Sequence, residues 1–193
     1  MERMGGGPTP EEMAKKNEPE ERVKSLGSQL HEEWRKPRWR EESKDYEPRI
    51  KKTKDQAWSQ AHGGAMEVDI ANTPYEGLPN EWQGENKISA EVAVTEVEKA
   101  IEAGVPLDES FIEAASSTLH DKWRERRITA GYNQGTLDAM KAKTERTSED
   151  QAYVDKWSYD QKNMVPYTSL SEEEKEKDRV IIRKAIEVCS KKE

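Results

Sequence analysis

Apolar residues recur at helical spacing in two long segments of the chain. The first predicted helix carries one apolar face, formed by Val23, Leu26, Leu30 and Trp34. Pro37 predicts the end of this helix, because proline cannot continue the backbone hydrogen bonding. A second helix is predicted from Asp108 to about Ala130, and its apolar face is formed by Ile112, Ala115, Leu119 and Trp123. Each position in the second set equals the first plus 89, which indicates an internal repeat.

Each half of the chain also closes with a predicted helix. The closing helix of the first half has one apolar face, formed by Ala90, Ala93, Val94, Val97 and Ile101. Gly104 and Pro106 predict its end. In the second half, Ser171 and Glu174 have the spacing of a capping box, which marks a helix start. The apolar stripe that follows is formed by Ile182, Ala185, Ile186 and Cys189.

The repeat is also visible in the letters of the sequence. The segment Leu30–Arg38 matches Leu119–Arg127, since both read Leu-His-x-x-Trp-Arg-x-x-Arg. Two further matches have offsets of 95 and 92: Asp55–Trp58 with Asp150–Tyr153, and Pro74–Leu78 with Pro166–Leu170. The changing offset indicates loops of unequal length inside otherwise similar units.

These patterns predict an all-α protein, because no segment shows sustained alternation of period two. We expect two pseudo-symmetric small helical units, 22–104 and 106–190, that pack on each other and have loop-rich middles. Short loop or ribbon elements are expected around Tyr132 to Gln134. Residues 1–20 combine three consecutive glycines with three prolines and few apolar side chains, so we expect a flexible, disordered tail there. The linker between the units is about Gly104 to Asp108.

Composition makes the expected core small. Leu, Ile, Val and Phe supply 27 of the 193 residues, whereas Lys and Arg number 32 and Asp and Glu 40. Such a charged chain with so few aliphatic residues approaches the composition of disordered proteins. Six Trp and six Tyr favour a folded chain, because disordered chains are poor in aromatic residues.

Several classes of protein are excluded by the same composition. No apolar run approaches the length of a membrane span, and the N-terminus lacks the apolar stretch of a secretory signal, so we expect no membrane association. A single cysteine, Cys189, fits a reducing, cytoplasmic setting. The net charge of −8 argues against a nucleic-acid polymer as partner.

Nothing in the sequence predicts an enzyme. The three histidines, His31, His62 and His120, have no cysteine at zinc spacing, so no metal site is expected. Cys189 continues an apolar helix face and is therefore expected in the core rather than as a nucleophile. No glycine-rich loop has the phosphate-binding pattern, and we expect no cofactor.

The strongest candidate for chemistry is the twin His-x-x-Trp-Arg-x-x-Arg motif. On a helix, His120, Trp123 and Arg127 share one face, because they are three and four residues apart. The first copy places its motif residues in the same way, at His31, Trp34 and Arg38. Tryptophan can stack on a base and arginine can bind phosphate, so two facing copies would form an aromatic clamp. The alternative is that both tryptophans anchor the cores of their units and both arginines form surface salt bridges.

The second unit resembles the RyR domain, a repeat named from ryanodine receptors and also found in bacterial and phage proteins. The resemblance lies in Leu119–Tyr132 (LHDKWRERRITAGY) and Asn163–Arg179 (NMVPYTSLSEEEKEKDR). Lys162 and Asn163 stand near the place where the family has a histidine. The first unit is similar to a degenerate copy, with Pro37 where the second unit has an arginine. The whole chain therefore looks like a tandem RyR pair.

The resemblance implies a non-enzymatic binding module for a nucleotide or a nucleotide-derived phosphorylated ligand, acting as a sensor or sponge. Matching positions imply that Trp34 and Trp123 stack the base between the repeats and that Arg38 and Arg127 hold phosphates. Four further residues are near-site candidates: His31, His120, Tyr75 and Tyr167. The two tyrosines could equally be hydrophobic plugs of their repeats. A different class of function also stays open, in which acidic helical faces dock a protein partner or build a homo-oligomer.

Overall fold

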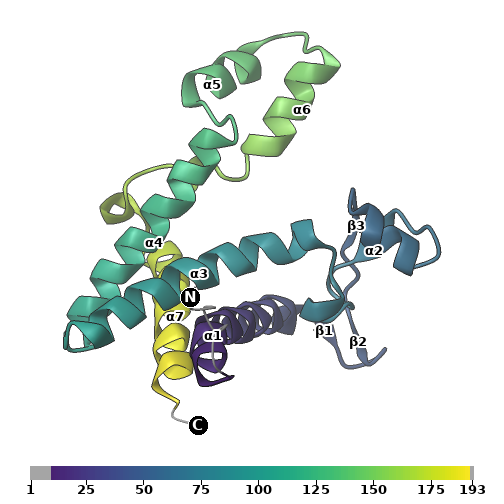
Figure 1. The fold of residues 1–193 in the computed structure, drawn as a ribbon. Coiled ribbons are helices and arrows are strands. Elements are labelled where there is room, and N and C mark those ends of the chain that lie inside the picture. Colours follow the sequence, from purple (N-terminus) through teal and green to yellow (C-terminus); the bar gives the residue numbers. More distant parts are fainter. Residues whose placement is uncertain (1–9, 192–193) are drawn as a thin grey trace, which may run out of the picture.

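The computed structural model describes residues 10–191, and this part of the chain is mostly helical. Figure 1 shows the arrangement of its seven α-helices: α1 (Pro10–Arg35), α2 (Gln56–Ala61), α3 (Asn80–Glu102), α4 (Glu109–Thr129), α5 (Gln134–Ala142), α6 (Ser148–Trp157) and α7 (Glu172–Ser190). Four short 3-10 helices accompany them: η1 (Lys36–Arg38), η2 (Tyr75–Gly77), η3 (Gln161–Asn163) and η4 (Tyr167–Ser169). The predominance of helix confirms the expected fold class.

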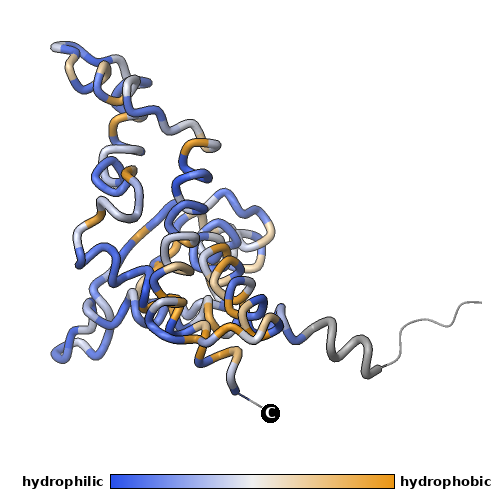
Figure 2. Tube along the Cα trace, turned by 90° about the vertical axis from the view of Figure 1, so that its left-hand side faces the viewer, coloured by the Kyte–Doolittle hydropathy of each residue, from blue (hydrophilic) through white to orange (hydrophobic). Residues whose placement is uncertain are grey.

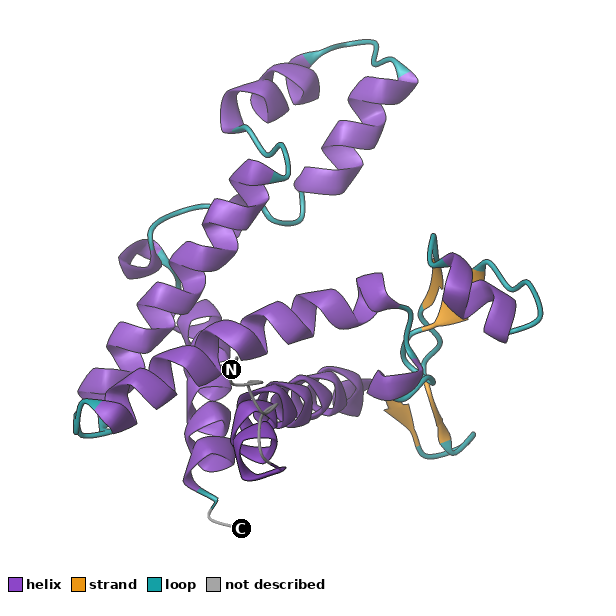
Figure 3. Cartoon of the chain, in the orientation of Figure 1, coloured by secondary structure: helices purple, strands orange, loops and turns teal. Residues whose placement is uncertain are grey.

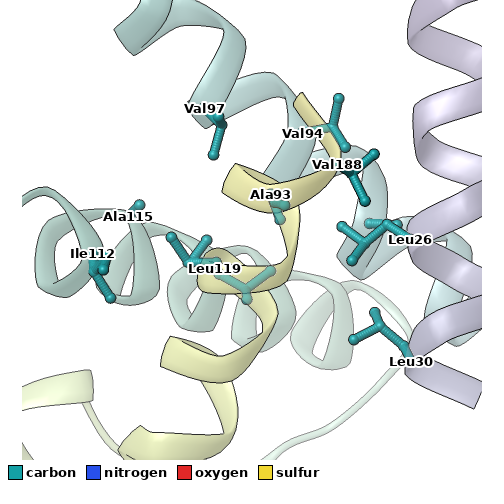
Figure 4. Packing of buried hydrophobic residues seen from close by; sticks show 12 residues of the cluster. Leu26, Leu30, Ala93, Val94, Val97, Ile112, Ala115, Leu119 and Val188 are labelled. Carbon is teal, nitrogen blue, oxygen red and sulfur yellow. The ribbon is translucent and has the colours of Figure 1, made fainter. Parts of the chain in front are cut away.

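The four long helices α1, α3, α4 and α7 share a single apolar core. The tube in Figure 2 is most hydrophobic where these helices meet and mostly hydrophilic elsewhere. Figure 4 shows side chains from all four helices converging there. The buried members are Leu26, Leu30, Ala90, Ala93, Val94, Val97, Ala115, Ile112, Leu119, Ile182, Ala185 and Val188. They include most of the apolar faces that the sequence predicts, so the helical periodicity located the core correctly.

Helices α3 and α7 are central to this core. They pack on each other, and each also contacts both α1 and α4. Many of their core residues are alanine, which lets the helix backbones approach closely. The two predicted units are therefore joined through their closing helices rather than connected by a linker alone.

The ends of the helices follow from local capping. The Asp108 side chain accepts the backbone N–H of Phe111 and starts α4, and the Ser171 side chain accepts the backbone N–H of Glu174 and starts α7. Gly104, at φ 65°, ends the turn after α3 in the left-handed conformation that glycine tolerates. The linker between the halves is as short as predicted.

The middle of the first half contains the only strands in the part of the chain that the structure describes. Two antiparallel ribbons form, β1 (Trp39–Arg40) with β2 (Asp45–Tyr46) and β3 (Ile50–Lys52) with β4 (Glu67–Asp69). Figure 3 shows these strands beside α2, at the end of α1. This part of the chain has a small apolar core of its own, in which Val68, Tyr75 and Leu78 are buried.

The middle of the second half is helical instead. Helices α5 and α6 extend from the end of α4 and pack on each other around buried Leu137, Val154 and Trp157 (Figure 1). Thr147 and Asp150 form a reciprocal capping box that starts α6. The two middles thus differ in structure, although both connect the end of one long helix to the start of the next.

One expectation about local structure was met and another was wrong. Tyr132 and Asn133 lie in a short loop, as expected, and Asn133 then caps α5, which begins at Gln134. The flexible tail expected over residues 1–20 is helical from Pro10 onward, since α1 extends N-terminally through Pro19. Residues 1–9 lie outside the described residues. Among the described helices, none combines the length and apolar character needed to cross a bilayer.

The shared core leads to a testable prediction about cooperativity. Leu26 is fully buried on α1, so Leu26→Ala should lower the free energy of unfolding by about 2–5 kcal/mol, as large-to-small core changes do. Because the core includes both halves, urea unfolding followed by circular dichroism should remain a single transition. The control is Val105→Ala, at a position that is 46% exposed, which should change stability little. Separate melting of the first half would contradict a shared core.

Candidate functional site

The two copies of the His-x-x-Trp motif have the same local geometry. The imidazole Nε2 of His31 donates to the backbone carbonyl of Thr73 at 3.0 Å, and that of His120 donates to the carbonyl of Val165 at 2.9 Å. Each histidine is almost fully buried. Each therefore ties its long helix to the residue just before a Pro-Tyr segment, which fixes where the returning chain docks.

Each tryptophan lies between its own histidine and its own arginine along the helix. The Trp34 ring stacks with His31 at a centroid distance of 5.7 Å, and the Arg38 guanidinium lies 4.1 Å from the ring centroid. In the second copy the corresponding distances are 5.6 Å for His120 with Trp123 and 5.2 Å for Arg127 over Trp123.

Both motif tryptophans are half-buried. They are therefore neither deep core anchors nor free stacking platforms.

The two tyrosines are buried where short 3-10 helices contact the long helices α1 and α4. Tyr75 and Tyr167 are each 3% exposed, within the 3-10 helices η2 and η4. The Tyr167 hydroxyl donates to the Glu113 carboxylate at 3.2 Å.

The structure does not bring the two motifs together into one clamp. Trp34 lies at the end of α1 that leads to β1, whereas Trp123 lies near the end of α4 that leads to α5. Figure 1 shows these helix ends pointing to different extremities of the molecule. The expected site residues form two separate clusters: His31, Trp34, Arg38 and Tyr75 in one, and His120, Trp123, Arg127 and Tyr167 in the other.

A cavity lies beside the second motif. Its volume is about 250 Å³, and it is enclosed by residues from α3, α4, α7 and the segment between α6 and η4. His120, Trp123 and Arg127 line it, but Trp34 does not. We call it the Trp123 pocket. Its other lining residues are Ser89, Leu119, Tyr159, Asp160, Asn163, Leu170, Glu174, Lys177 and Asp178.

His120 has an acceptor near each of its ring nitrogens. Its Nδ1 lies 3.5 Å from the Asp178 carboxylate, while its Nε2 donates to the Val165 carbonyl. Burial lowers its pKa, but the hydrogen bond to Asp178, the bond to Val165 and the charge of Asp178 outweigh this effect, so the pKa is raised above its ordinary value of 6.5. The surroundings of His120 therefore favour its protonated form more than water does.

The first copy lacks the carboxylate that faces His120. At the position that corresponds to Asp178 by the offset of 92, the chain has Asn86. Burial lowers the pKa of His31 below 6.5, and the hydrogen bond to Thr73 only partly opposes it. One substitution in the closing helix thus gives the two histidines opposite protonation preferences.

Arg127 is engaged by two carboxylates. Its Nη1 and Nη2 donate to Glu85 at 3.0 and 3.3 Å, and its Nε lies 3.0 Å from Asp160. The Nε–H is not aimed at the Asp160 oxygen, so this second contact is an ion pair without a hydrogen bond. Burial raises the pKa of Asp160, with the negative charge of Glu85 adding to it and Arg127 opposing it.

Another group of charges forms the rim of the Trp123 pocket. Glu174 accepts from Lys162 and Lys177, each at 2.8 Å, and from Asn163 at 3.0 Å. The hydrogen bonds from the two lysines lower the pKa of Glu174 to about 2. Every cation of the pocket therefore faces a carboxylate, and the pocket is nearly charge-balanced.

Several residues of this pocket were missed by sequence reasoning. Asp178 lies inside the segment Asn163–Arg179 but was not singled out there, although comparison with Asn86 in the first half marks it as a difference. Tyr159 and Asp160 lie in a segment with no repeat signal, and only the fold brings them beside Arg127. Asn163 lines the pocket at the place where the RyR resemblance has a histidine.

The described residues contain no cluster of three or more metal-ligating side chains. Cys189 is half-buried against the shared core, and burial raises the pKa of its thiol, which disfavours the thiolate form.

Compared with known protein families, with curated proteins and with solved structures, the chain gives no significant match. The RyR resemblance therefore depends on the motif residues of this sequence alone.

The contrast between the two histidines predicts opposite effects of pH on stability. Because the folded-state pKa of His120 is raised, its stabilising contribution is fully present below pH 6.5 and is lost as the pH rises through the folded-state pKa. The difference in unfolding free energy between the wild type and His120→Gln should therefore be greatest below about pH 6.5 and should shrink as the pH rises above it. Urea titrations at each pH measure it.

His31→Gln provides the matched control. The lowered pKa of His31 makes its contribution present above pH 6.5 and lost as the pH falls through the folded-state value. The wild type should therefore lose stability relative to His31→Gln on acidification. If the unfolding free energies of both variants, each relative to the wild type, change with pH in the same direction, Asp178 does not give the two histidines different pKa values.

Proposed function

We propose that the chain is a non-catalytic, tandem RyR-type binding module whose second half binds a nucleotide or a nucleotide-derived phosphorylated ligand. The observation that carries the proposal is the Trp123 pocket, which is lined by the motif residues His120, Trp123 and Arg127. The recurrence of the same contacts around His31 and Trp34 supports a relationship between the halves as tandem repeats. A soluble sensor or sponge for a signalling nucleotide is the concrete form of this proposal.

The size of the pocket suits a base rather than a whole dinucleotide. Its volume of about 250 Å³ lies just below the usual range of about 300–1,000 Å³ for drug-sized ligands. A flat ring would lie against Trp123 and Tyr159, and the phosphates would lie at the rim near Arg127 and Lys177. Tyr159 is 81% exposed, so its ring is free to close over a bound base.

Phosphate binding requires Arg127 to exchange partners. Glu85, which holds two of its nitrogens, is half-exposed and lies outside the pocket lining. Exposed ion pairs contribute at most about 1 kcal/mol, so a phosphate can displace this carboxylate at low cost. In this arrangement Glu85 competes with the ligand for the same guanidinium.

One prediction from this proposal concerns Trp123, on which the base would stack. Trp123→Ala should weaken binding of an adenine or guanine nucleotide about five- to more than a hundredfold, because base stacking contributes roughly 1–3 kcal/mol. Trp34→Ala is the matched control and should leave affinity unchanged, because Trp34 does not line the pocket. Isothermal titration calorimetry gives the affinities, and melting temperatures of the same variants report on folding.

Two outcomes would count against the proposal. Equal losses from both tryptophan variants would favour a clamp formed between the halves. Absence of binding across a nucleotide panel would favour the alternative of a protein-interaction module.

The second prediction concerns the competing carboxylate. Glu85→Gln should strengthen nucleotide binding a few-fold, because it removes a charged partner of Arg127 without removing a pocket residue. Arg127→Ala should weaken binding and flatten its dependence on salt, since ions screen a phosphate contact. A Glu85→Gln protein that binds less tightly than the wild type would contradict the exchange of partners.

A further inference from the structure

A second cavity lies in the first half, in the groove between α1 and α3. Its volume is about 600 Å³, and it does not share residues with the Trp123 pocket. The lining residues combine both charge types and one tyrosine: Pro19, Glu20, Glu21, Val23, Lys24, Tyr75, Glu76, Gln83, Lys87 and Glu91. We call it the Tyr75 groove.

In the second half, the corresponding groove between α4 and α7 is closed by ion pairs. Glu113 on α4 accepts from Arg179 on α7 at 2.7 and 3.1 Å, and Arg183 donates to Glu109 at 3.2 Å. The hydroxyl of Tyr167 also donates to Glu113. Two ion pairs therefore connect α4 and α7. They lie one helical turn apart, at two successive levels along the helices.

The first half has like charges at the same positions. By the offset of 89 along the first helices and 92 along the closing helices, Glu113 corresponds to Lys24 and Arg179 to Lys87. Similarly, Glu109 corresponds to Glu20 and Arg183 to Glu91. All four first-half residues line the Tyr75 groove, so two lysines and two glutamates replace two ion pairs. Like charges cannot close the groove, which explains why it is open.

Tyr75 supplies an unused polar group within the groove. It is 3% exposed and lines the cavity, but its hydroxyl has no hydrogen-bond partner among the described residues. Tyr167, its counterpart, uses its hydroxyl on Glu113. A Cβ added at Gly27 would lie 2.6 Å from the Tyr75 hydroxyl, so glycine is required for α1 to lie this close to it. The hydroxyl borders the cavity and is not among the buried unpartnered atoms of the described residues, so it is accessible to a ligand in the groove.

From this arrangement we propose that the Tyr75 groove is a binding site for a basic amino acid or a similar small zwitterion. Lys24, Lys87 and the Tyr75 hydroxyl would hold its carboxylate. Glu20 and Glu91 would hold its side-chain cation. Glu20 lies four residues from Lys24, and Glu91 four from Lys87, so the two levels are about 6 Å apart along the helices. An extended arginine or lysine side chain provides this separation.

The net charge of the groove favours a cationic ligand. Glu21 and Glu76 add to the other two glutamates, and with two lysines the lining has a net charge of −2. Free arginine has a carboxylate and two cationic groups, so it complements both levels and the excess negative charge. This site is independent of the Trp123 pocket and of the function proposed for it.

The test is calorimetric titration of the full chain with L-arginine. We expect saturable binding, at least about tenfold weaker binding of agmatine, which lacks the carboxylate, and none of L-glutamate. The double variant Lys24→Glu with Lys87→Arg installs the charges of the Glu113–Arg179 pair. It should reduce arginine affinity by tenfold or more, while the melting temperature stays unchanged or rises. Tyr75→Phe should weaken binding severalfold.

Two controls separate this site from other effects. Lys99→Glu with Lys122→Arg changes the net charge equally on surfaces outside the groove and should leave arginine binding unchanged. Trp123→Ala should also leave it unchanged, so failure of the nucleotide proposal is distinguishable from failure here. The inference is overturned by no saturable arginine binding, by equal affinity for agmatine, or by binding that survives the Lys24→Glu, Lys87→Arg change.

Discussion

Helices α3 and α7 pack on each other at the centre of the molecule, and the other two long helices both dock on this pair. The apolar stripes are narrow, and many of their members are alanine. One helix pair of this composition buries too little apolar surface to offset the loss of chain entropy. Sharing one core among four helices solves this problem for a chain with 27 Leu, Ile, Val and Phe residues in total.

Once the core is fixed by small apolar residues, the charges at its edges determine where the molecule is closed and where it is open. Between α4 and α7, two glutamates of α4 pair with two arginines of α7 and close the interface. Between α1 and α3, the same positions carry like charges, and a groove remains. The two helix pairs therefore present different surfaces to solvent.

The buried histidines show how one residue changes the chemistry of a repeated structure. Both make the same hydrogen bond to the chain that returns before a Pro-Tyr segment. Only His120 has a carboxylate on its other nitrogen, and only His120 borders the Trp123 pocket. Arg127 is paired with Glu85 and Asp160, so under the proposed function a phosphorylated ligand would compete with carboxylates that are already present.

The sequence by itself determined the four long helices, their buried faces, the short linker and the matching motif positions, because helical periodicity and capping are local properties. It did not determine the ribbons between Trp39 and Asp69 or the two helices between Gln134 and Trp157, since short elements depend on what they pack against. The tertiary structure alone decided that Trp34 and Trp123 lie apart, because their separation depends on how the helix pairs cross. It also decided that Asp160 and Glu85, far from the motif in sequence, neutralise Arg127. Such contacts arise only when the chain has folded and distant segments meet.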